Sequence, residues 1–225
     1  MRDDPRLAAS GRDLIISAAF PLWQTDANRG SPGTASAVTL ADRMDREDHR
    51  RHLIRILQGA YSGELAAGFA YRGHWKSVKD TNERAAIQKI EQEEWVHRKR
   101  VGEMLASLGG APRKLREAKL WVIGRTIGVA CHLIGWFLPM YFAGRLESGN
   151  VIEYQVAASH AGALALKEFE ADLLVMSRVE KEHELFFLNV IAGHRLLPIV
   201  SSVFGWGAVK QPPAESVSEA ASEAD

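Results

Sequence analysis

The sequence predicts an all-α protein, a four-helix bundle with one additional amphipathic or apolar crossover helix. Apolar residues recur every three or four positions over long stretches, which is the spacing of one helical face. Two of these stretches carry the same Glu-x-x-His motif, and glycines or capping residues separate them. With 225 residues and 46% hydrophobic content, the chain is long enough to bury one sizeable core.

The composition excludes several classes of protein. The 28 basic and 28 acidic residues balance, so no net charge favours nucleic acid, and we expect no nucleic-acid partner. The single cysteine, Cys131, excludes an internal disulfide or a cysteine-based zinc site and suits a reducing compartment. The first residues lack the cationic start and long apolar core of a cleaved signal.

Three regions follow from local composition. Residues 1–44 are expected to form an N-terminal extension and linker, because 25–44 are rich in Gly, Ser, Thr and Ala. Residues 45–210 are expected to form the folded domain. Residues 211–225 carry four acidic and no basic side chains, which predicts a disordered acidic tail.

Two helices are expected in the first half of the domain. The first runs from Asp45 to about Val78, with Leu53, Leu57 and Glu64 on one face. The second begins at Asp80, where Glu83 completes a capping-box pattern, and ends before two glycines near residue 108. A further helix is expected at about 168–191.

Residues 112–144 connect the two halves, and they are basic at first and then apolar. The uncharged run from Thr126 to Phe142 is short for a membrane-spanning helix. Two interpretations have equal weight: a helix on a membrane surface and a buried crossover helix. In the first, four basic residues would face lipid head groups: Arg113, Lys114, Arg116 and Lys119.

The two Glu-x-x-His motifs are Glu94 with His97 and Glu180 with His183. Residues three apart on a helix project from one face, and carboxylate with imidazole suits a first-row transition metal. A single such pair often arises by chance on a solvated helix. Two pairs, each within an apolar stripe, indicate a metal site, and a bundle that holds two ions needs two more glutamates.

Glu64 is the first of these, because a turn near Lys79 would bring it level with Glu94 in a helical hairpin. For the second, Glu153 and Glu147 are both candidates. We prefer Glu153, since Glu147 lies beside Ser148 and Gly149 near an expected helix start. Four buried carboxylates and two imidazoles would be unfavourable together without cations to compensate their charge.

Several aromatic, histidine and glutamate side chains near these positions are not expected to be metal ligands. Tyr71, Tyr154 and Trp95 are expected to pack within the bundle. His132 and His160 are interpreted as ordinary helix residues rather than parts of the site. Glu91 and Glu93 are expected to face solvent, with Glu91 as an alternative outer partner of the site.

Several segments resemble the demethoxyubiquinone hydroxylase family of ferritin-like di-iron enzymes. These are YSGELAA at 61–67, EQEEWVH at 91–97 followed by MLASLGGAP at 104–112, VIEYQV at 151–156 and EKEH at 180–183. The similarity covers residues 55–190. It implies a ferritin-like bundle, with terminal carboxylates at Glu64 and Glu153, bridging carboxylates at Glu94 and Glu180, and imidazole ligands at His97 and His183.

The resemblance also implies a function. We expect an oxygen-dependent di-iron monooxygenase that hydroxylates a polyprenyl benzoquinone in ubiquinone biosynthesis, with two iron ions (Fe²⁺/Fe³⁺) as cofactor. No Gly-rich dinucleotide loop is present, so electrons are expected from an external donor, NADH or a reductase. The expected partners are dioxygen, a lipid-like quinone, a membrane surface and either a second copy of the chain or other biosynthetic proteins. The expected location is peripheral, on the cytoplasmic face of a membrane or the matrix face of the mitochondrial inner membrane.

Two departures from the family keep other functions open. Family members usually have His-Ala-Gly-Glu where this chain has Tyr61-Ser62-Gly63-Glu64, and the loop between the last two ligand helices is shorter. The alternatives are a ferritin-like di-iron oxidase for another lipid or hydrocarbon and a non-catalytic metal-binding protein.

Overall fold

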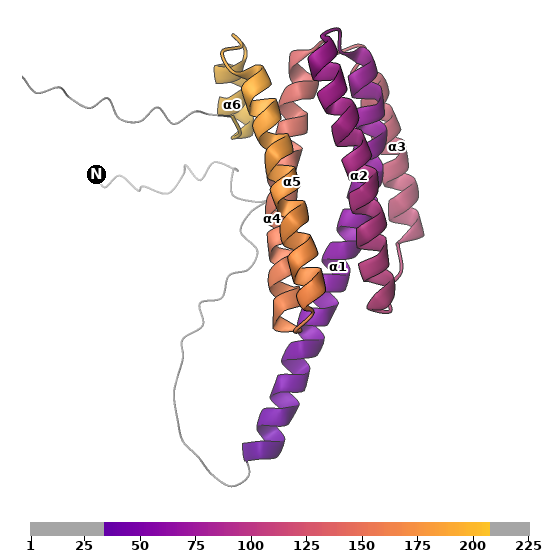
Figure 1. Cartoon of the computed structure of the whole chain (residues 1–225), viewed down its shortest axis with the longest axis vertical. Coiled ribbons are helices and arrows are strands. Elements are labelled where there is room, and N and C mark those ends of the chain that lie inside the picture. The colour runs from indigo at the N-terminus through magenta and orange to yellow at the C-terminus, as the bar shows by residue number, and fades with distance from the viewer. Residues whose placement is uncertain (1–33, 208–225) are drawn as a thin grey trace, which may run out of the picture. The chain divides into compact units, whose positions relative to one another are not determined.

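The structure, a computed structural model, describes residues 34–207, and every regular element in that range is a helix (Figure 1). The all-α prediction is therefore confirmed for the described residues. The expected acidic tail and most of the expected N-terminal extension lie outside this range. The six helices are α1 (Thr34–Ser77), α2 (Thr81–Ser107), α3 (Lys114–Ala130), α4 (Phe137–Ala163), α5 (Lys167–Ile191) and α6 (Leu197–Phe204).

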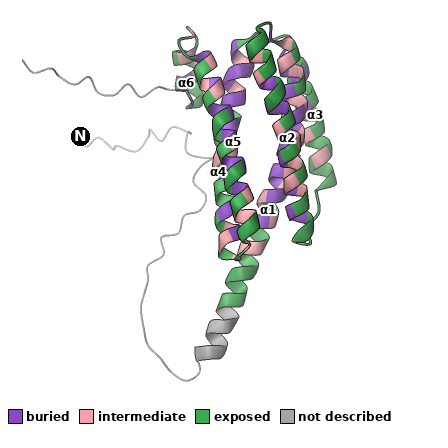
Figure 2. Cartoon of the chain, viewed as in Figure 1, coloured by how far each residue is buried: buried purple, intermediate pink, exposed green. Residues whose placement is uncertain are grey.

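Two apolar clusters show how the long helices run. One contains Leu57 of α1, Met104 of α2, Ala157 of α4 and Leu173 of α5. The other contains residues from the opposite part of each helix: Tyr71, Ile87, Met140 and Phe187. Consequently α1 is antiparallel to α2, and α4 is antiparallel to α5. Figure 2 shows buried residues on the sides of these helices that face one another.

The helix boundaries agree with local sequence signals in the first hairpin. Asp80 caps α2, and its side chain accepts hydrogen bonds from the backbone N–H groups of Asn82 and Glu83 at 2.9 Å each. The Glu83 carboxylate accepts a hydrogen bond from Trp136 Nε1, at 2.7 Å, and so ties the start of α2 to the start of α4.

Helix α1 begins at Thr34, so residues 34–44 of the expected extension and linker are helical. After Gly33 the chain has no further Gly or Pro until Gly59, and Ala, Leu, Arg and Met are good helix formers. The packed unit that carries the other helices begins at Ala41.

The segment 112–144 is not one helix. It forms α3, a turn at residues 131–136 and the start of α4, and the turn contains Gly135 with a left-handed φ of 83°. Pro139 lies in the first turn of α4, where its missing N–H leaves no helical hydrogen bond unmade. Among the described residues, no helix has both the length and the apolar character that a membrane span requires.

Helix α3 lies directly against α1 through small residues. A Cβ atom added to Gly124 would lie 2.4 Å from the carbonyl oxygen of Ala66, and one added to Gly73 would lie 2.3 Å from the Cα atom of Gly128. Real Cβ atoms do not approach backbone so closely, so these positions must stay without side chains if the two helices are to touch. The contact fixes α3 as one wall of the cavity described below.

We expect Gly124→Ala to lower the free energy of unfolding by about 1–3 kcal/mol, because the methyl group would force α3 away from α1. Chemical denaturation followed by circular dichroism measures this change. Gly149→Ala is the matched control, since it is an exposed helical glycine with no atom within 4 Å of the added Cβ. The control should stabilise the protein by about 0.5–1 kcal/mol, and equal effects at both sites would contradict the tight contact.

Candidate metal centre

Six side chains from four helices meet between the two apolar clusters. They form two overlapping groups, in each of which one ligand atom per residue lies within 4.8 Å of the others. The first group is Glu64, Glu94, His97 and Glu180, and the second is Glu94, Glu147, Glu180 and His183. Every member is buried, and Glu94 and Glu180 belong to both groups. Each group could hold a metal ion, and the two shared carboxylates are placed to bridge a pair.

Most of the ligand atoms of these groups have no hydrogen-bond partner. Seven such atoms are buried without a partner: Glu64 Oε2, Glu94 Oε1 and Oε2, His97 Nδ1, Glu180 Oε1 and Oε2, and His183 Nδ1. A buried polar atom left unpaired costs about 1–3 kcal/mol. Because all seven occur at one place and are oxygen or imidazole nitrogen atoms, the donor set fits first-row divalent cations.

The imidazoles approach the carboxylates without hydrogen-bond geometry. His97 Nδ1 lies 2.9 Å from Glu180 Oε1, yet both atoms remain unpaired. His183 Nδ1 lies 3.4 Å from Glu94 Oε1 and 3.5 Å from Glu180 Oε2. Lone pairs that converge in this way are satisfied by a shared cation.

Outer hydrogen bonds orient these ligands. His183 Nε2 lies 3.0 Å from Glu93 Oε2, an arrangement that directs Nδ1 toward the centre when Nε2 carries the proton. The expectation that Glu93 faces solvent is wrong for its carboxylate, which contacts the ring of His183. Tyr154 donates to Glu64, and Tyr71 donates to Glu147, so both tyrosines hold carboxylates as well as pack.

The structure places Glu147, and not Glu153, beside Glu94, Glu180 and His183. The preference for Glu153 is therefore corrected. Glu147 lies in the interior of α4, which begins at Phe137 and continues through Gly149, so the expected helix start beside it does not exist. Glu147 and Tyr154 are seven residues apart and share the inward face, whereas Glu153 is rotated from Tyr154 by about 100°.

The remaining residues singled out from the sequence lie elsewhere. Glu91 is buried but accepts hydrogen bonds from Arg72, Trp75 and Trp95, and it belongs to neither metal group. His160 Nδ1 lies 2.8 Å from His49 Nδ1, which links α4 to α1 outside the centre. His132 is exposed in the turn after α3.

Burial and mutual repulsion change the acidity of the cluster. Burial raises the pKa of Glu94 and Glu147 well above the usual carboxyl value, and neighbouring carboxylates raise it further. Burial also raises the pKa of Glu64. Burial alone would raise the pKa of Glu180, but the nearby imidazoles of His183 and His97 lower it below the usual range. Among the described residues, only these two histidines form ion pairs with the four carboxylates.

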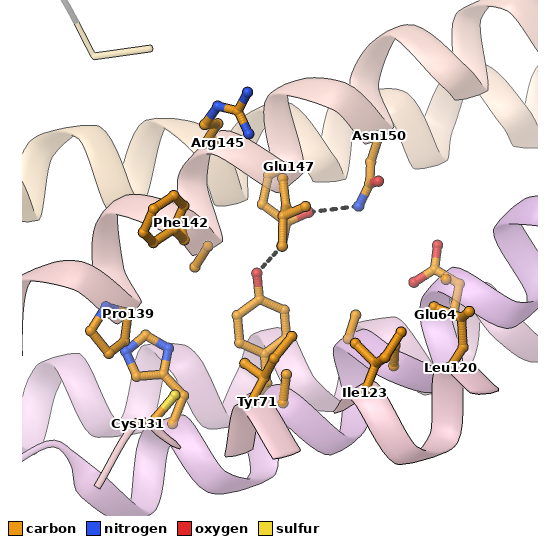
Figure 3. Close-up of a pocket in the computed structure, with 18 of the residues that line it drawn as sticks. Glu64, Tyr71, Leu120, Ile123, Cys131, Pro139, Phe142, Arg145, Glu147 and Asn150 are labelled. Carbon is orange, nitrogen blue, oxygen red and sulfur yellow. Dashed lines mark hydrogen bonds between the residues drawn. The ribbon is translucent and has the colours of Figure 1, made fainter. Parts of the chain in front are cut away.

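An apolar cavity of about 520 Å³ lies beside the metal groups, between α1, α3 and α4. Figure 3 shows Glu64 and Leu120 at one end, Cys131 and Pro139 at the other, and Tyr71 with Glu147 between them. Glu147 also accepts a hydrogen bond from Asn150 at 3.0 Å. A ligand in this cavity would lie against two of the metal-binding carboxylates.

His74 also lines the cavity, although its role was not predicted from the sequence. The signal was present, because His74 lies three residues after Tyr71 and shares the helical face that carries Glu64.

Comparisons with protein-family models, curated proteins and solved structures found no match for the chain. The family resemblance therefore depends on the motif residues alone.

We expect Glu147→Ala to reduce the metal content of the purified protein after loading with ferrous iron, because one of the two groups loses a carboxylate. Glu153→Ala is the matched control on the same helix and should retain the wild-type metal content. Mass spectrometry of metals in folded protein, verified by circular dichroism, measures both. A lower metal content in Glu153→Ala than in Glu147→Ala would restore Glu153 as the ligand.

The metal-free protein should lose stability as pH rises from about 5 to 8. Glu64, Glu94 and Glu147 have raised pKa values in the folded state, and the carboxylates of Glu180 and Glu64 also raise the pKa of His97 against the effect of burial. These groups bind protons more tightly when folded, so their stabilising effect is complete below the unfolded pKa and is lost as they deprotonate. Glu180 acts in the opposite direction but at lower pH, because its pKa lies below the usual carboxyl range, and His74, whose pKa burial lowers to about 4, offsets part of the loss as pH rises toward 6.5.

Thermal unfolding of chelator-treated protein across this pH range measures the effect. Metal-loaded protein should show no such loss, because a cation favours the deprotonated ligands. A melting temperature that rises with pH in the metal-free protein would contradict the buried cluster.

Proposed function

We propose that this protein is a di-iron monooxygenase with a ferritin-like bundle that hydroxylates a polyprenyl benzoquinone intermediate, of the demethoxyubiquinone type, in ubiquinone biosynthesis. One observation carries the proposal: two groups of buried ligand atoms, most of them unpaired, share two carboxylates and adjoin an apolar cavity. This arrangement accords with the motif residues that resemble the hydroxylase family.

The ligand assignment follows from the two groups. Glu64 and His97 would hold one iron, Glu147 and His183 would hold the other, and Glu94 with Glu180 would bridge them. When bound and reduced by an external donor, the iron pair supplies dioxygen activation, with one oxygen atom entering the substrate and the other leaving as water.

The chain's own residues prepare the site for this chemistry. Hydrogen bonds from Tyr71 and Asn150 fix Glu147, and the hydrogen bond from Tyr154 fixes Glu64. Apolar side chains of α3 and α4, including Ile123, Ile127 and Phe142, line the cavity. An apolar ring bound there would contact the metal-binding side of α1 and α4.

The surface of α3 suits delivery of a lipid-like substrate from a membrane. Leu115, Val122 and Val129 are 89%, 53% and 63% exposed, which is unusual for large apolar side chains on one helix. The exposed basic residues at the start of the helix, among them Lys114 and Lys119, are placed to contact anionic head groups. Because Leu120 and Ile123 of the same helix line the cavity, a substrate could pass from the lipid layer along α3.

A second candidate is a di-iron oxidase for another lipid or hydrocarbon. The apolar lining of the cavity favours it, since such walls accept many molecules. The departure from the family at Tyr61 also keeps it open; in the structure Arg98 covers this ring, with Cζ 3.7 Å from the ring centroid.

The quinone pool of a strain that lacks the gene tests the main proposal. We expect a precursor without one ring hydroxyl group to accumulate, and re-expression of the wild-type chain to remove it. The Glu180→Ala variant should fail to do so, because it loses a ligand shared by both groups, whereas Glu153→Ala should retain some or all of the activity. An unchanged quinone pool in the deletion strain would reject the quinone substrate.

A further inference from the structure

His74 is a buried imidazole in the wall of the cavity, and its ring has no hydrogen-bond partner within residues 34–207. The residue is 3% exposed, and its Nε2 atom is buried and unpaired. Neither ring nitrogen forms a side-chain hydrogen bond with another described residue. Its ring instead lies beside two aromatic rings, nearly parallel to Tyr71 with centroids 6.3 Å apart and to Phe187 with centroids 6.2 Å apart, and those two rings are 6.0 Å from each other.

This environment makes His74 a neutral group with unused hydrogen-bonding capacity. Burial lowers the pKa of His74 to about 4, so the imidazole is uncharged near neutral pH. A neutral imidazole has one N–H donor and one nitrogen acceptor. Leaving either group unpaired in an apolar environment costs about 1–3 kcal/mol, which a ligand oxygen would recover.

His74 lies on α1 close to Tyr71, whose hydroxyl group holds a carboxylate of one metal group. It lies about one helical turn beyond Tyr71, or about 5 Å along α1, on the side away from Glu64. Tyr71 is hydrogen-bonded to Glu147, and Figure 3 shows both between the Glu64 end of the cavity and the end at Cys131 and Pro139. A six-membered ring that contacts Glu147 and Tyr71 could therefore place a ring oxygen within reach of His74.

We propose that His74 is a substrate-binding residue that hydrogen-bonds a carbonyl or hydroxyl oxygen on the ring of the substrate. The cavity then selects an apolar molecule with an oxygen-bearing ring over a plain hydrocarbon. This inference rests on the proposed function and deepens it, because it distinguishes the quinone from the hydrocarbon candidate.

Two ring compounds that differ only in two hydroxyl groups provide the test: 2,3,5-trimethylhydroquinone and 1,2,4-trimethylbenzene. Their dissociation constants would be measured by calorimetry, without oxygen, on the full chain loaded with zinc as a redox-inert ion. We expect the wild type to prefer the hydroquinone and His74→Leu to reduce that preference about tenfold. His74→Gln, which keeps a donor and an acceptor, should retain most of it, and His132→Leu, at an exposed histidine, should not change it.

Nitrogen-15 NMR of the wild-type histidine side chains gives a second readout that needs no variant at the site. The ring nitrogens of His74 should shift on saturation with the hydroquinone and stay in place with the hydrocarbon. Unmoved signals at saturation, or an unchanged preference in folded His74→Leu, would overturn the role of His74 and leave the proposed function standing. Failure of both compounds to bind the wild type would remove the cavity as the substrate site, so the proposals for His74 and for quinone hydroxylation would fall together.

Discussion

Four carboxylates and two imidazoles occupy one buried layer between two apolar clusters, and the rest of the structure depends on how their charge is compensated. Without cations, the layer leaves seven donor atoms unpaired and forces several carboxyl groups to hold protons. With cations, the same atoms become ligands that join four helices. Metal binding would thus couple to the stability of the fold as well as to chemistry.

Helix α3, which supplies none of the six side chains, helps to determine what can reach this layer. Glycines at the contact between α1 and α3 allow the two backbones to touch, and α3 thereby closes a cavity whose inner wall includes Glu64 and Glu147. The outer side of α3 exposes large apolar residues. One helix therefore has two features, because it forms a wall of the cavity and exposes an apolar surface.

The cavity wall is mostly apolar, but its polar groups include Arg116, Arg145 and Glu153 as well as those that lie near the metal groups. Tyr71 and Asn150 are committed to Glu147, and Tyr154 is committed to Glu64. His74 stands apart because it is buried in the wall without a partner. In an apolar cavity, a single unpaired imidazole has a large influence on which ligand oxygen is bound and in what orientation.

The sequence by itself determined the helical fold, the turn near Lys79 and five of the six residues of the cluster. These depend on local periodicity, capping and the repeated Glu-x-x-His spacing, which are properties of single helices. Only the tertiary structure decided between Glu147 and Glu153. Ser148, Gly149 and Asn150 resemble a helix boundary locally, but packing of α4 against α5 and α1 carries the helix through them and turns Glu147 inward. It also decided the roles of Glu93 and His74, since Glu93 meets His183 of another helix and the ring of His74 meets no hydrogen-bond partner among the described residues.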